Sequence, residues 1–373
     1  MICHSIKSID MDEWGLSLVA PLAGKRFPIS ATFEVTNRCN LNCQHCFINE
    51  AANNESVRKR ELSTAEIKDI INQMVEAGML FLTLTGGEAL LRSDFTEIYT
   101  YARRKGLLVI LFTNGTLITQ EIAELLGEIR PFSVDISLYG ASQPVYEAVT
   151  RQPGSFTRCI QGIERILDQG INLGLKSELT TVNVDELQEM VALAEHYKVG
   201  FRYDGLLWPR LDGTSPFPQE VQLPIKILVG LDTMDEKRRK AVIKEMDRLA
   251  GLKNRDERIF SCGAGLREFH LDSQGRMSLC TMVRTPSFSL REMSLLQAWE
   301  KLGDQRKLRR TRSSPCTTCN TNSFCAHCPG WSQALFHDNE SVVKFVCEYG
   351  RQRSMNAQKI YEEKTMEVIE RYD

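Results

Sequence analysis

Short apolar or β-branched runs alternate with amphipathic helical patterns between residue 31 and about residue 213. Each run is bounded by turn residues, which is typical of β-strands. We predict strands at Thr32–Thr36, Leu80–Thr85, Leu107–Thr113, Phe132–Leu138, Leu173–Leu179 and Gly200–Tyr203. The clearest helical pattern begins with a capping box from Ser63 to Glu66 and continues with an apolar stripe of 3.6-residue period. Further helices are predicted at Phe95–Lys105, Gln120–Ile129, Phe156–Gln169 and Val184–His196.

This succession of strand-then-helix units predicts an α/β fold with a parallel sheet and crossover helices. Six such units can form an open, partial barrel or a flat, doubly wound sheet, and the hydrophobic pattern is compatible with both. In either arrangement, ligands are expected at the carboxyl ends of the strands.

The pattern changes after Gly213. Three prolines within residues 216–224 indicate a linker, and a charged helix follows from about Asp235 to Leu249. A cysteine-rich section then contains a predicted β-hairpin, Phe269–Leu271 and Arg276–Cys280, before a last helix at Arg353–Tyr372. We therefore divide the chain into an N-terminal extension (1–30), an α/β domain (31–215), a linker with a bridging helix (216–255), a cysteine-rich domain (256–350) and a C-terminal helix (351–373).

The charge balance and the hydropathy argue against a nucleic-acid-binding protein and against a membrane-spanning one. The 373 residues have a formal net charge of -2, whereas a nucleic-acid-binding domain is usually strongly basic. No apolar run approaches the roughly 20 residues of a membrane span, and no signal peptide is recognisable. We expect a cytoplasmic protein that binds neither nucleic acid nor membrane. The basic runs Lys237–Lys240 and Arg306–Arg312 are either solvated helix faces or a landing site for an acidic partner or peptide.

Cysteine usage is the most informative part of the composition. Ten of the 12 cysteines lie in two groups, and in a reducing compartment such clustering indicates metal rather than disulfides. Cys159 lies on an amphipathic helix and is expected to be buried packing, and Cys3 is expected to be incidental. The two groups are Cys39, Cys43 and Cys46, and then Cys262, Cys280, Cys316, Cys319, Cys325, Cys328 and Cys347.

The first group, Cys39-x3-Cys43-x2-Cys46, directly follows the first predicted strand. Three thiolates suit a four-iron cluster that keeps one iron open for an outside ligand. The alternative is a zinc knuckle that adds His45 or a distant fourth ligand.

The string CNLNCQHC in this position resembles the signature of the radical S-adenosylmethionine (SAM) superfamily. Three further strand ends match that family in order: Gly86-Gly87-Glu88, Thr113-Asn114-Gly115 and Asp135–Gly140. The resemblance covers residues 31–213 and implies a partial (β/α)6 TIM-like barrel.

The resemblance also implies the chemistry. A [4Fe-4S] cluster on Cys39, Cys43 and Cys46 would bind SAM at its open iron. Its reduction by a low-potential donor such as ferredoxin or flavodoxin would cleave SAM to a 5′-deoxyadenosyl radical, which removes a hydrogen atom from the substrate. The residues expected to contact SAM are His45, Gly86, Gly87, Glu88 and Ser137.

The second group of seven cysteines resembles the SPASM extension of radical SAM enzymes, which holds two auxiliary [4Fe-4S] clusters. The resemblance assigns Cys316, Cys319, Cys325 and Cys347 to an outer cluster, and Cys262, Cys280 and Cys328 to an inner one. Only two residues separate Cys325 from Cys328, where the family usually has three. Because the inner set has only three cysteines, the inner cluster would keep an open or non-cysteine-ligated iron. Zinc is the alternative, with His270, His327 or His337 as additional ligands.

Charged residues on the last two strands of the α/β domain are expected to face its interior. Lys176, Arg202 and Arg210 are candidate contacts for the SAM carboxylate or the substrate, since a charge inside a barrel is costly unless it is paired or ligand-bound. Glu178, Asp204 and Trp208 belong to the same region. We also expect an ion pair between Arg210 and Asp212. Tyr139 is a candidate donor of a proton or a hydrogen atom. No catalytic residue is assigned.

SPASM-type enzymes are most often maturases of ribosomally made peptides or of proteins, forming thioether, carbon–carbon or oxidised products. We expect this function, with a peptide or protein substrate. Some 31 residues precede the first strand, too few for a fused leader-recognition domain, so a separate recognition protein or docking on the basic helices is expected. The alternatives are dehydrogenation or epimerisation of a small molecule in cofactor or antibiotic biosynthesis, and an iron–sulfur or zinc scaffold without turnover.

Overall fold

The computed structural model describes residues 25–48, 50–211, 219–250, 258–311, 314–317, 319, 321, 324–325 and 327–369. Cys3 and Asp212, both named from the sequence, lie outside these ranges. No helix within them is long and apolar enough to cross a membrane.

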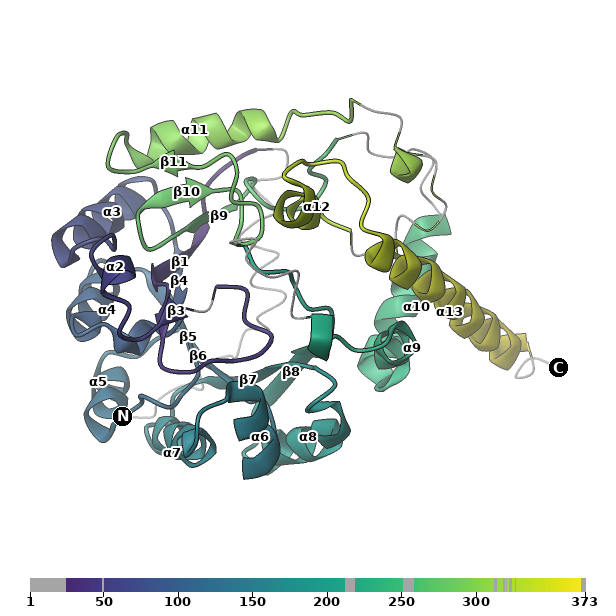
Figure 1. Cartoon of the computed structure of the whole chain (residues 1–373), viewed down its shortest axis with the longest axis horizontal. Coiled ribbons are helices and arrows are strands. Elements are labelled where there is room, and N and C mark those ends of the chain that lie inside the picture. The colour runs from purple at the N-terminus through teal and green to yellow at the C-terminus, as the bar shows by residue number, and fades with distance from the viewer. Residues whose placement is uncertain are drawn as a thin grey trace, which may run out of the picture.

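The central element is one curved sheet in the strand order β11-β10-β9-β1-β4-β5-β6-β7-β8. Six consecutive strands of it, from β1 to β8, are parallel and form a partial (β/α)6 barrel with helices on the outside (Figure 1). The predicted strands and the predicted partial barrel are confirmed. The strands are β1 (Ser30–Thr36), β4 (Phe81–Gly86), β5 (Leu108–Thr113), β6 (Ser133–Ser137), β7 (Leu173–Glu178) and β8 (Gly200–Asp204). A separate two-stranded sheet joins β2 (Arg38–Cys39) to β3 (Glu50–Ala51).

The helices of the barrel agree with the predicted ranges to within a few residues. The capping box is present at α3, where the Ser63 side chain accepts from the Glu66 N–H and the Glu66 side chain accepts from the Ser63 N–H. Sequence reasoning missed α2 and α6, which are only one to two turns long. The helices are α2 (Glu55–Arg58), α3 (Thr64–Glu76), α4 (Phe95–Arg104), α5 (Gln120–Glu128), α6 (Gln143–Thr150), α7 (Ser155–Asp168) and α8 (Leu187–His196).

Alternate residues of β4, β5 and β7 have different environments. On β4, Leu82 and Leu84 are fully buried, whereas Thr83 and Thr85 between them are only partly buried. Side chains of a strand alternate between its two faces, so the apolar face packs under the helices and the more polar face lines the barrel interior. Cys159 on α7 is fully buried in the apolar layer, as expected.

The cysteine-rich section continues the barrel sheet. Strands β9 (Glu268–Leu271) and β10 (Arg276–Ser278) form the predicted antiparallel hairpin, which β11 (Phe288–Ser289) extends. β9 also pairs in parallel with β1, with Thr32 opposite His270. The second cysteine group is therefore anchored to the strand that leads into the first.

The last helix begins earlier than predicted. α13 runs over Lys344–Ile369, so Cys347 lies inside it rather than before it. Cys347 and Gly350 interrupt the apolar periodicity of its first turns, and glycine lowers helix propensity, which explains the wrong start. α13 packs against α9 (Ile225–Gly230) and α10 (Glu236–Ala250). The remaining helices are α11 (Leu295–Gln305) and α12 (Pro329–Phe336).

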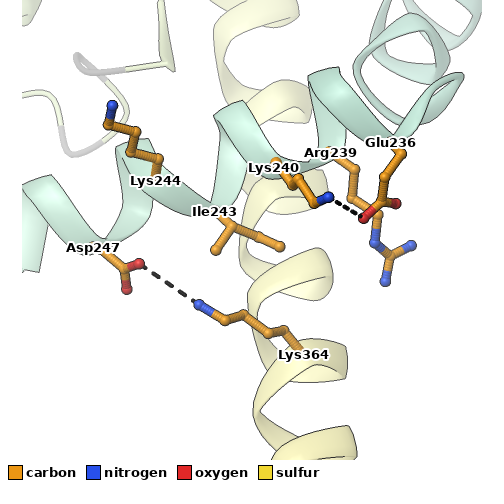
Figure 2. Close-up of a pocket in the computed structure, with 7 residues that line it drawn as sticks. All are labelled: Glu236, Arg239, Lys240, Ile243, Lys244, Asp247 and Lys364. Atoms are coloured by element: carbon orange, nitrogen blue, oxygen red, sulfur yellow. Dashed lines mark ion pairs between the residues drawn. The ribbon is translucent and has the colours of Figure 1, made fainter.

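A charged hollow lies between α10 and α13 (Figure 2). Its basic residues are largely neutralised within the chain, because Lys240 pairs with Glu236 at 3.4 Å and Lys364 with Asp247 at 3.6 Å. Arg239 pairs with Glu363 on α13. These contacts favour the interpretation of Lys237–Lys240 as a solvated helix face with ion pairs, and not as a docking site for an acidic peptide.

Candidate functional site

The first cysteine group lies in the loop that follows β1. Cys39 ends β2, and its sulfur accepts from the Leu41 N–H at 3.4 Å and from the Asn114 amide at 3.7 Å. His45 in the same loop packs edge-on against Tyr139, with ring centroids 4.6 Å apart. The structure thus gathers residues from three strand ends around this loop.

The three thiols are close enough to affect one another's ionisation. Burial raises the pKa of Cys39 to about 12 and that of Cys43 well above its ordinary value, and the Cys46 thiol raises both further. Neighbouring buried thiols oppose each other's ionisation until cations replace their protons. The donor set therefore suits a multi-iron centre, whose positive charge would hold three thiolates together.

Gly86 and Gly87 are required by close approach of the chain. A Cβ at Gly86 would lie 2.1 Å from the Thr36 carbonyl oxygen, and one at Gly87 would lie 2.4 Å from the Arg38 carbonyl oxygen. The Gly87 N–H donates to Thr36 at 2.8 Å and the Glu88 N–H donates to Arg38 at 2.9 Å. These two hydrogen bonds hold the glycine loop (Gly86–Glu88) against the segment that precedes Cys39.

Glu88 is buried and both of its carboxylate oxygens are occupied within the protein. Oε1 accepts from the Thr113 hydroxyl at 2.8 Å and from the Leu90 N–H, and Oε2 accepts from the Asn114 N–H at 2.8 Å. The geometry gives Glu88 a positioning role, tying the end of β4 to the end of β5. Its contact with SAM stays a prediction.

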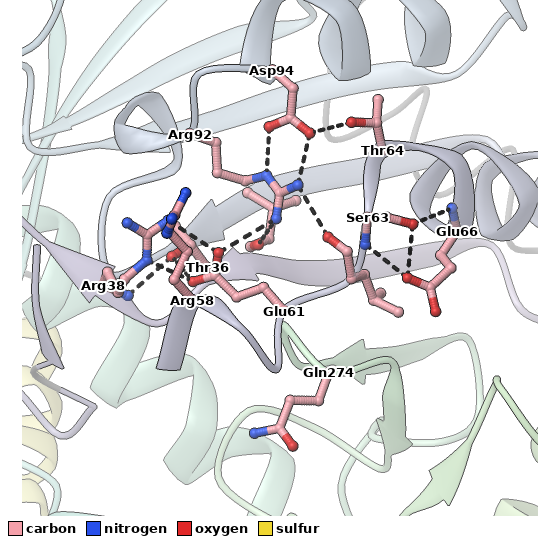
Figure 3. Close-up of polar contacts among 12 residues, drawn as sticks. Thr36, Arg38, Arg58, Glu61, Ser63, Thr64, Glu66, Arg92, Asp94 and Gln274 are labelled. Carbon is pink, nitrogen blue, oxygen red and sulfur yellow. Dashed lines mark hydrogen bonds and ion pairs between the residues drawn. The ribbon is translucent and has the colours of Figure 1, made fainter. Parts of the chain in front are cut away.

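A buried ion-pair network that the sequence did not reveal supports the same loops (Figure 3). Arg38, which precedes Cys39, donates to Glu61 at 2.9 and 3.0 Å, and Arg92, four residues after Glu88, lies 3.7 Å from the same carboxylate. Arg92 also pairs with Asp94 and donates to the Val35 carbonyl. The Glu61 side chain is only 5% exposed. Glu61 therefore couples the cysteine loop to the glycine loop.

We expect Glu61→Gln to destabilise the protein by about 3–5 kcal/mol, because it leaves the buried Arg38 guanidinium without a counter-charge, whereas Arg92 keeps its pair with Asp94. A matched control is Glu66→Gln, which can retain the helix cap and loses only the exposed Arg291 pair, worth about 0–1 kcal/mol. Urea denaturation of both variants, followed by circular dichroism, measures the difference. Equal stability losses in the two variants would contradict the role given to Glu61.

The structure sorts the seven remaining clustered cysteines into two sets. Burial raises the pKa of Cys328 to about 12, and the neighbouring thiols of Cys280 and Cys262 contribute to the increase. Burial also raises the pKa of Cys347, where the neighbouring thiols that contribute are those of Cys325, Cys316 and Cys319. One set therefore contains three thiols and the other four.

Two of the three histidines considered as further metal ligands, His327 and His270, have other partners. His327 Nε2 contacts the Ser341 carbonyl at 3.2 Å, and His270 lies between Ser278 and Glu34. His337 ends α12 in a left-handed conformation. No three His, Cys, Asp or Glu side chains of the described residues converge at single-ion distances, so the thiols are neighbours and not a preformed single-ion site.

Charged residues of β6, β7 and β8 line the barrel interior. Arg202 pairs with Asp135 at 2.5 Å, and the Lys176 ammonium lies 3.2 Å from the centroid of the Phe112 ring. Burial lowers the pKa of Lys176 to about 7, which the nearby Asp135 partly opposes. Burial raises the pKa of Tyr139, which the nearby Ser137 hydroxyl partly opposes. Ser177 has the opposite orientation and is buried away from this interior wall.

A second buried cluster joins the barrel interior to the hairpin of the cysteine-rich section. Glu34 on β1 pairs with Arg284 at 2.6 Å and with His270 on β9 at 3.3 Å. Despite its burial, these partners lower the pKa of Glu34 to about 2. Sequence reasoning missed this cluster, although an acidic residue in the middle of an apolar strand was a signal.

The segment after β8 approaches the second cysteine group. The Trp208 ring packs against Trp331 of α12 in a tilted arrangement with centroids 5.0 Å apart, and Cys328 is the N-cap of that helix. Arg210 has an interaction partner in the structure. The predicted Arg210–Asp212 pair lies partly outside the described residues.

Comparisons with known proteins agree with this geometry. The family model described as the radical SAM superfamily matches residues 33–196. The chain is 30% identical over 315 residues to the mycofactocin maturase MftC of Mycolicibacterium smegmatis, covering 80% of this chain and 77% of that protein. It is 27% identical over 330 residues to an AdoMet-dependent heme synthase of Methanosarcina barkeri, covering 83% of this chain and 94% of that protein.

Two solved structures share the fold. Streptococcus suis SuiB bound to its precursor peptide SuiA matches with a TM-score of 0.65 and 17% identity, covering 93% of this chain and 84% of that one. Native anSMEcpe with bound AdoMet matches with a TM-score of 0.67 and 15% identity, covering 93% of this chain and 100% of that one. At these identities the likeness concerns the architecture alone.

Proposed function

Because the chain belongs to the radical SAM superfamily and is a SPASM-type enzyme, we propose that it oxidatively modifies a peptide or protein substrate. Membership of the superfamily implies one [4Fe-4S] cluster and SAM. When bound, they supply a 5′-deoxyadenosyl radical that removes a hydrogen atom from the substrate.

The chain's own residues would hold these groups. Cys39, Cys43 and Cys46 supply the thiolates, and the loop of Gly86 and Gly87 offers backbone to the SAM amino group. His45 and Tyr139 form an aromatic wall beside the thiols, near which Ser137 supplies a hydroxyl. Lys176 is the cation best placed for a carboxylate, since no described residue forms an ion pair with it and it faces the interior.

The second cysteine group would hold two auxiliary [4Fe-4S] clusters. The set of four thiols, Cys316, Cys319, Cys325 and Cys347, can saturate a cubane, whereas Cys262, Cys280 and Cys328 leave one iron for another ligand. Mutual repulsion within each set supports the same pairing of cysteines with clusters.

The observation that carries the choice of substrate is the mixed charge of the barrel interior. Asp135 and Arg202 neutralise each other, Glu34 is neutralised by Arg284, and Glu178 follows Lys176 on the same face. A peptide presents neutral backbone dipoles that suit such a wall, whereas an anionic substrate with several carboxylates would require an excess of cations.

The test is co-expression with precursor peptides encoded beside the gene, followed by mass spectrometry of the peptide. We expect the loss of two hydrogen atoms from one peptide, localised by fragmentation to one or two residues. An unchanged mass for every neighbouring peptide, together with turnover of a small molecule, would overturn the peptide assignment.

The second candidate is oxidation of a small molecule in cofactor biosynthesis. Its support is the similarity to the heme synthase, which extends over 94% of that protein. In either case the enzyme needs a low-potential electron donor, for which ferredoxin and flavodoxin are the proposed classes. A peptide substrate with a leader would also need a separate recognition protein or docking on the basic run Arg306–Arg312, since the hollow between α10 and α13 is largely neutralised by its own ion pairs.

A further inference from the structure

Glu178 lies at the carboxyl end of β7 and has no role in the binding of the clusters or SAM described above. It lies on the same face of β7 as Lys176, two residues before it, and is opposite Asp204 in the register with β8. Glu178 is accessible to solvent, yet its carboxyl has many protein atoms around it. This combination describes a side chain in the concave interior of the barrel and not one on the outer surface.

The other interior carboxylates have partners that fix them. Within the described ranges, neither a hydrogen bond nor an ion pair engages the carboxyl of Glu178, whereas each of the others is held. Glu34 is bound by Arg284, Glu88 by Thr113 and Asn114, Asp135 by Arg202, and Asp204 Oδ1 by the N–H groups of Gly205 and Leu206. Glu178 is therefore the interior carboxyl that is free to exchange a proton with a substrate.

Every product class in the proposed function requires such a group. Formation of a thioether, a carbon–carbon bond or an unsaturated side chain removes two hydrogens from the substrate. One leaves as a hydrogen atom to the 5′-deoxyadenosyl radical, which becomes 5′-deoxyadenosine. The remaining substrate radical must then lose one electron, to a one-electron acceptor of the iron–sulfur class, and one proton, to a base.

We propose that Glu178 is the base that takes this proton. This inference rests on the proposed oxidative function but does not depend on which of its substrates is used. Glu178 lies near Tyr139. Burial raises the pKa of the Tyr139 phenol, and the charges of Cys43 and Glu178 raise it further, so the Glu178 carboxyl lies on the same side of the barrel as the first cysteine loop. A base at this place lies on the side of the barrel interior where the proposed radical would form.

The charges that face Glu178 are consistent with the role. Burial, and then the neighbouring Asp204, raise the pKa of Glu178 to about 8, while Lys176 on its own strand and Arg202 on β8 oppose the increase. A base is most effective when its pKa lies near the working pH. As the pH rises through about 8, the ionised form that can accept a proton becomes the major one.

The test compares Glu178→Gln and Glu178→Asp with the control Glu189→Gln, an exposed carboxylate on α8. The probe is the precursor peptide that the wild-type enzyme modifies, deuterated at the reacting position. We expect E178Q to transfer deuterium into 5′-deoxyadenosine as the wild type does, while final product falls by about 100-fold or more. E178D should recover part of the product, and E189Q should match the wild type.

A measurement without substrate separates this inference from the function itself. In the full chain labelled with 13C-glutamate, infrared difference spectra should contain a protonated carboxyl band that disappears as the pH rises through about 8 and is absent from E178Q. Wild-type product formation by E178Q, or a band that persists in E178Q, would overturn the assignment. If the wild type modifies no peptide, the proposed function fails and the infrared result still decides whether Glu178 carries the proton.

Discussion

Replacing Cys43 with serine is expected to abolish SAM cleavage. Burial and the neighbouring thiols of Cys46 and Cys39 raise the pKa of Cys43, which places the three thiols together, and a serine hydroxyl is a poor substitute for a thiolate at iron. The anaerobically reconstituted variant should bind about four irons fewer than the wild type, which should hold about twelve. Formation of 5′-deoxyadenosine under dithionite, measured by chromatography, should fall below detection.

The matched control for this variant is Cys159→Ser, in a cysteine that is buried but belongs to neither group. It should keep its iron and its SAM cleavage at some cost in stability, because the hydroxyl is placed in an apolar layer. If Cys43→Ser still cleaved SAM at the wild-type rate, the first cysteine loop would not be the site of that reaction.

Cys280→Ala is expected to separate SAM cleavage from product formation. It removes one of the three thiols in the set with Cys262 and Cys328, and a cluster with only two protein thiolates should be lost. We expect about four irons fewer, retained formation of 5′-deoxyadenosine and loss of the modified peptide, because the electron of the substrate radical has no acceptor.

Cys347→Ala provides the comparison, since it belongs to the set of four. Its three remaining thiolates should retain a cluster with one open iron, so the iron content should stay close to that of the wild type while a different part of the reduced electron paramagnetic resonance spectrum changes. Identical spectra for the two variants would contradict the division of the seven cysteines into two sets.

Much of the barrel was predictable because its signals are local. Apolar strands with turn residues at both ends located β1 and β4 to β8, and the capping box at Ser63 located α3. The cysteine spacing and the strand-end glycines indicated the site for the same reason. These features depend on neighbours in sequence, which the chain itself displays.

The contacts that support the site are long-range and were not predictable. Glu61 lies between Arg38 and Arg92, and Glu34 meets His270 only because β9 joins β1 across more than 200 residues. Nothing in the sequence pairs these residues. The early start of α13 was missed for a related reason, since its first turns are stabilised by packing and not by helix propensity.

The most direct test of the account is the electron paramagnetic resonance spectrum of the anaerobically reconstituted, dithionite-reduced protein, recorded with and without SAM. We predict that SAM changes the signal of one cluster, that the change is absent from Cys43→Ser, and that 5′-deoxyadenosine accumulates. A colourless, zinc-loaded protein whose SAM remains intact would contradict it.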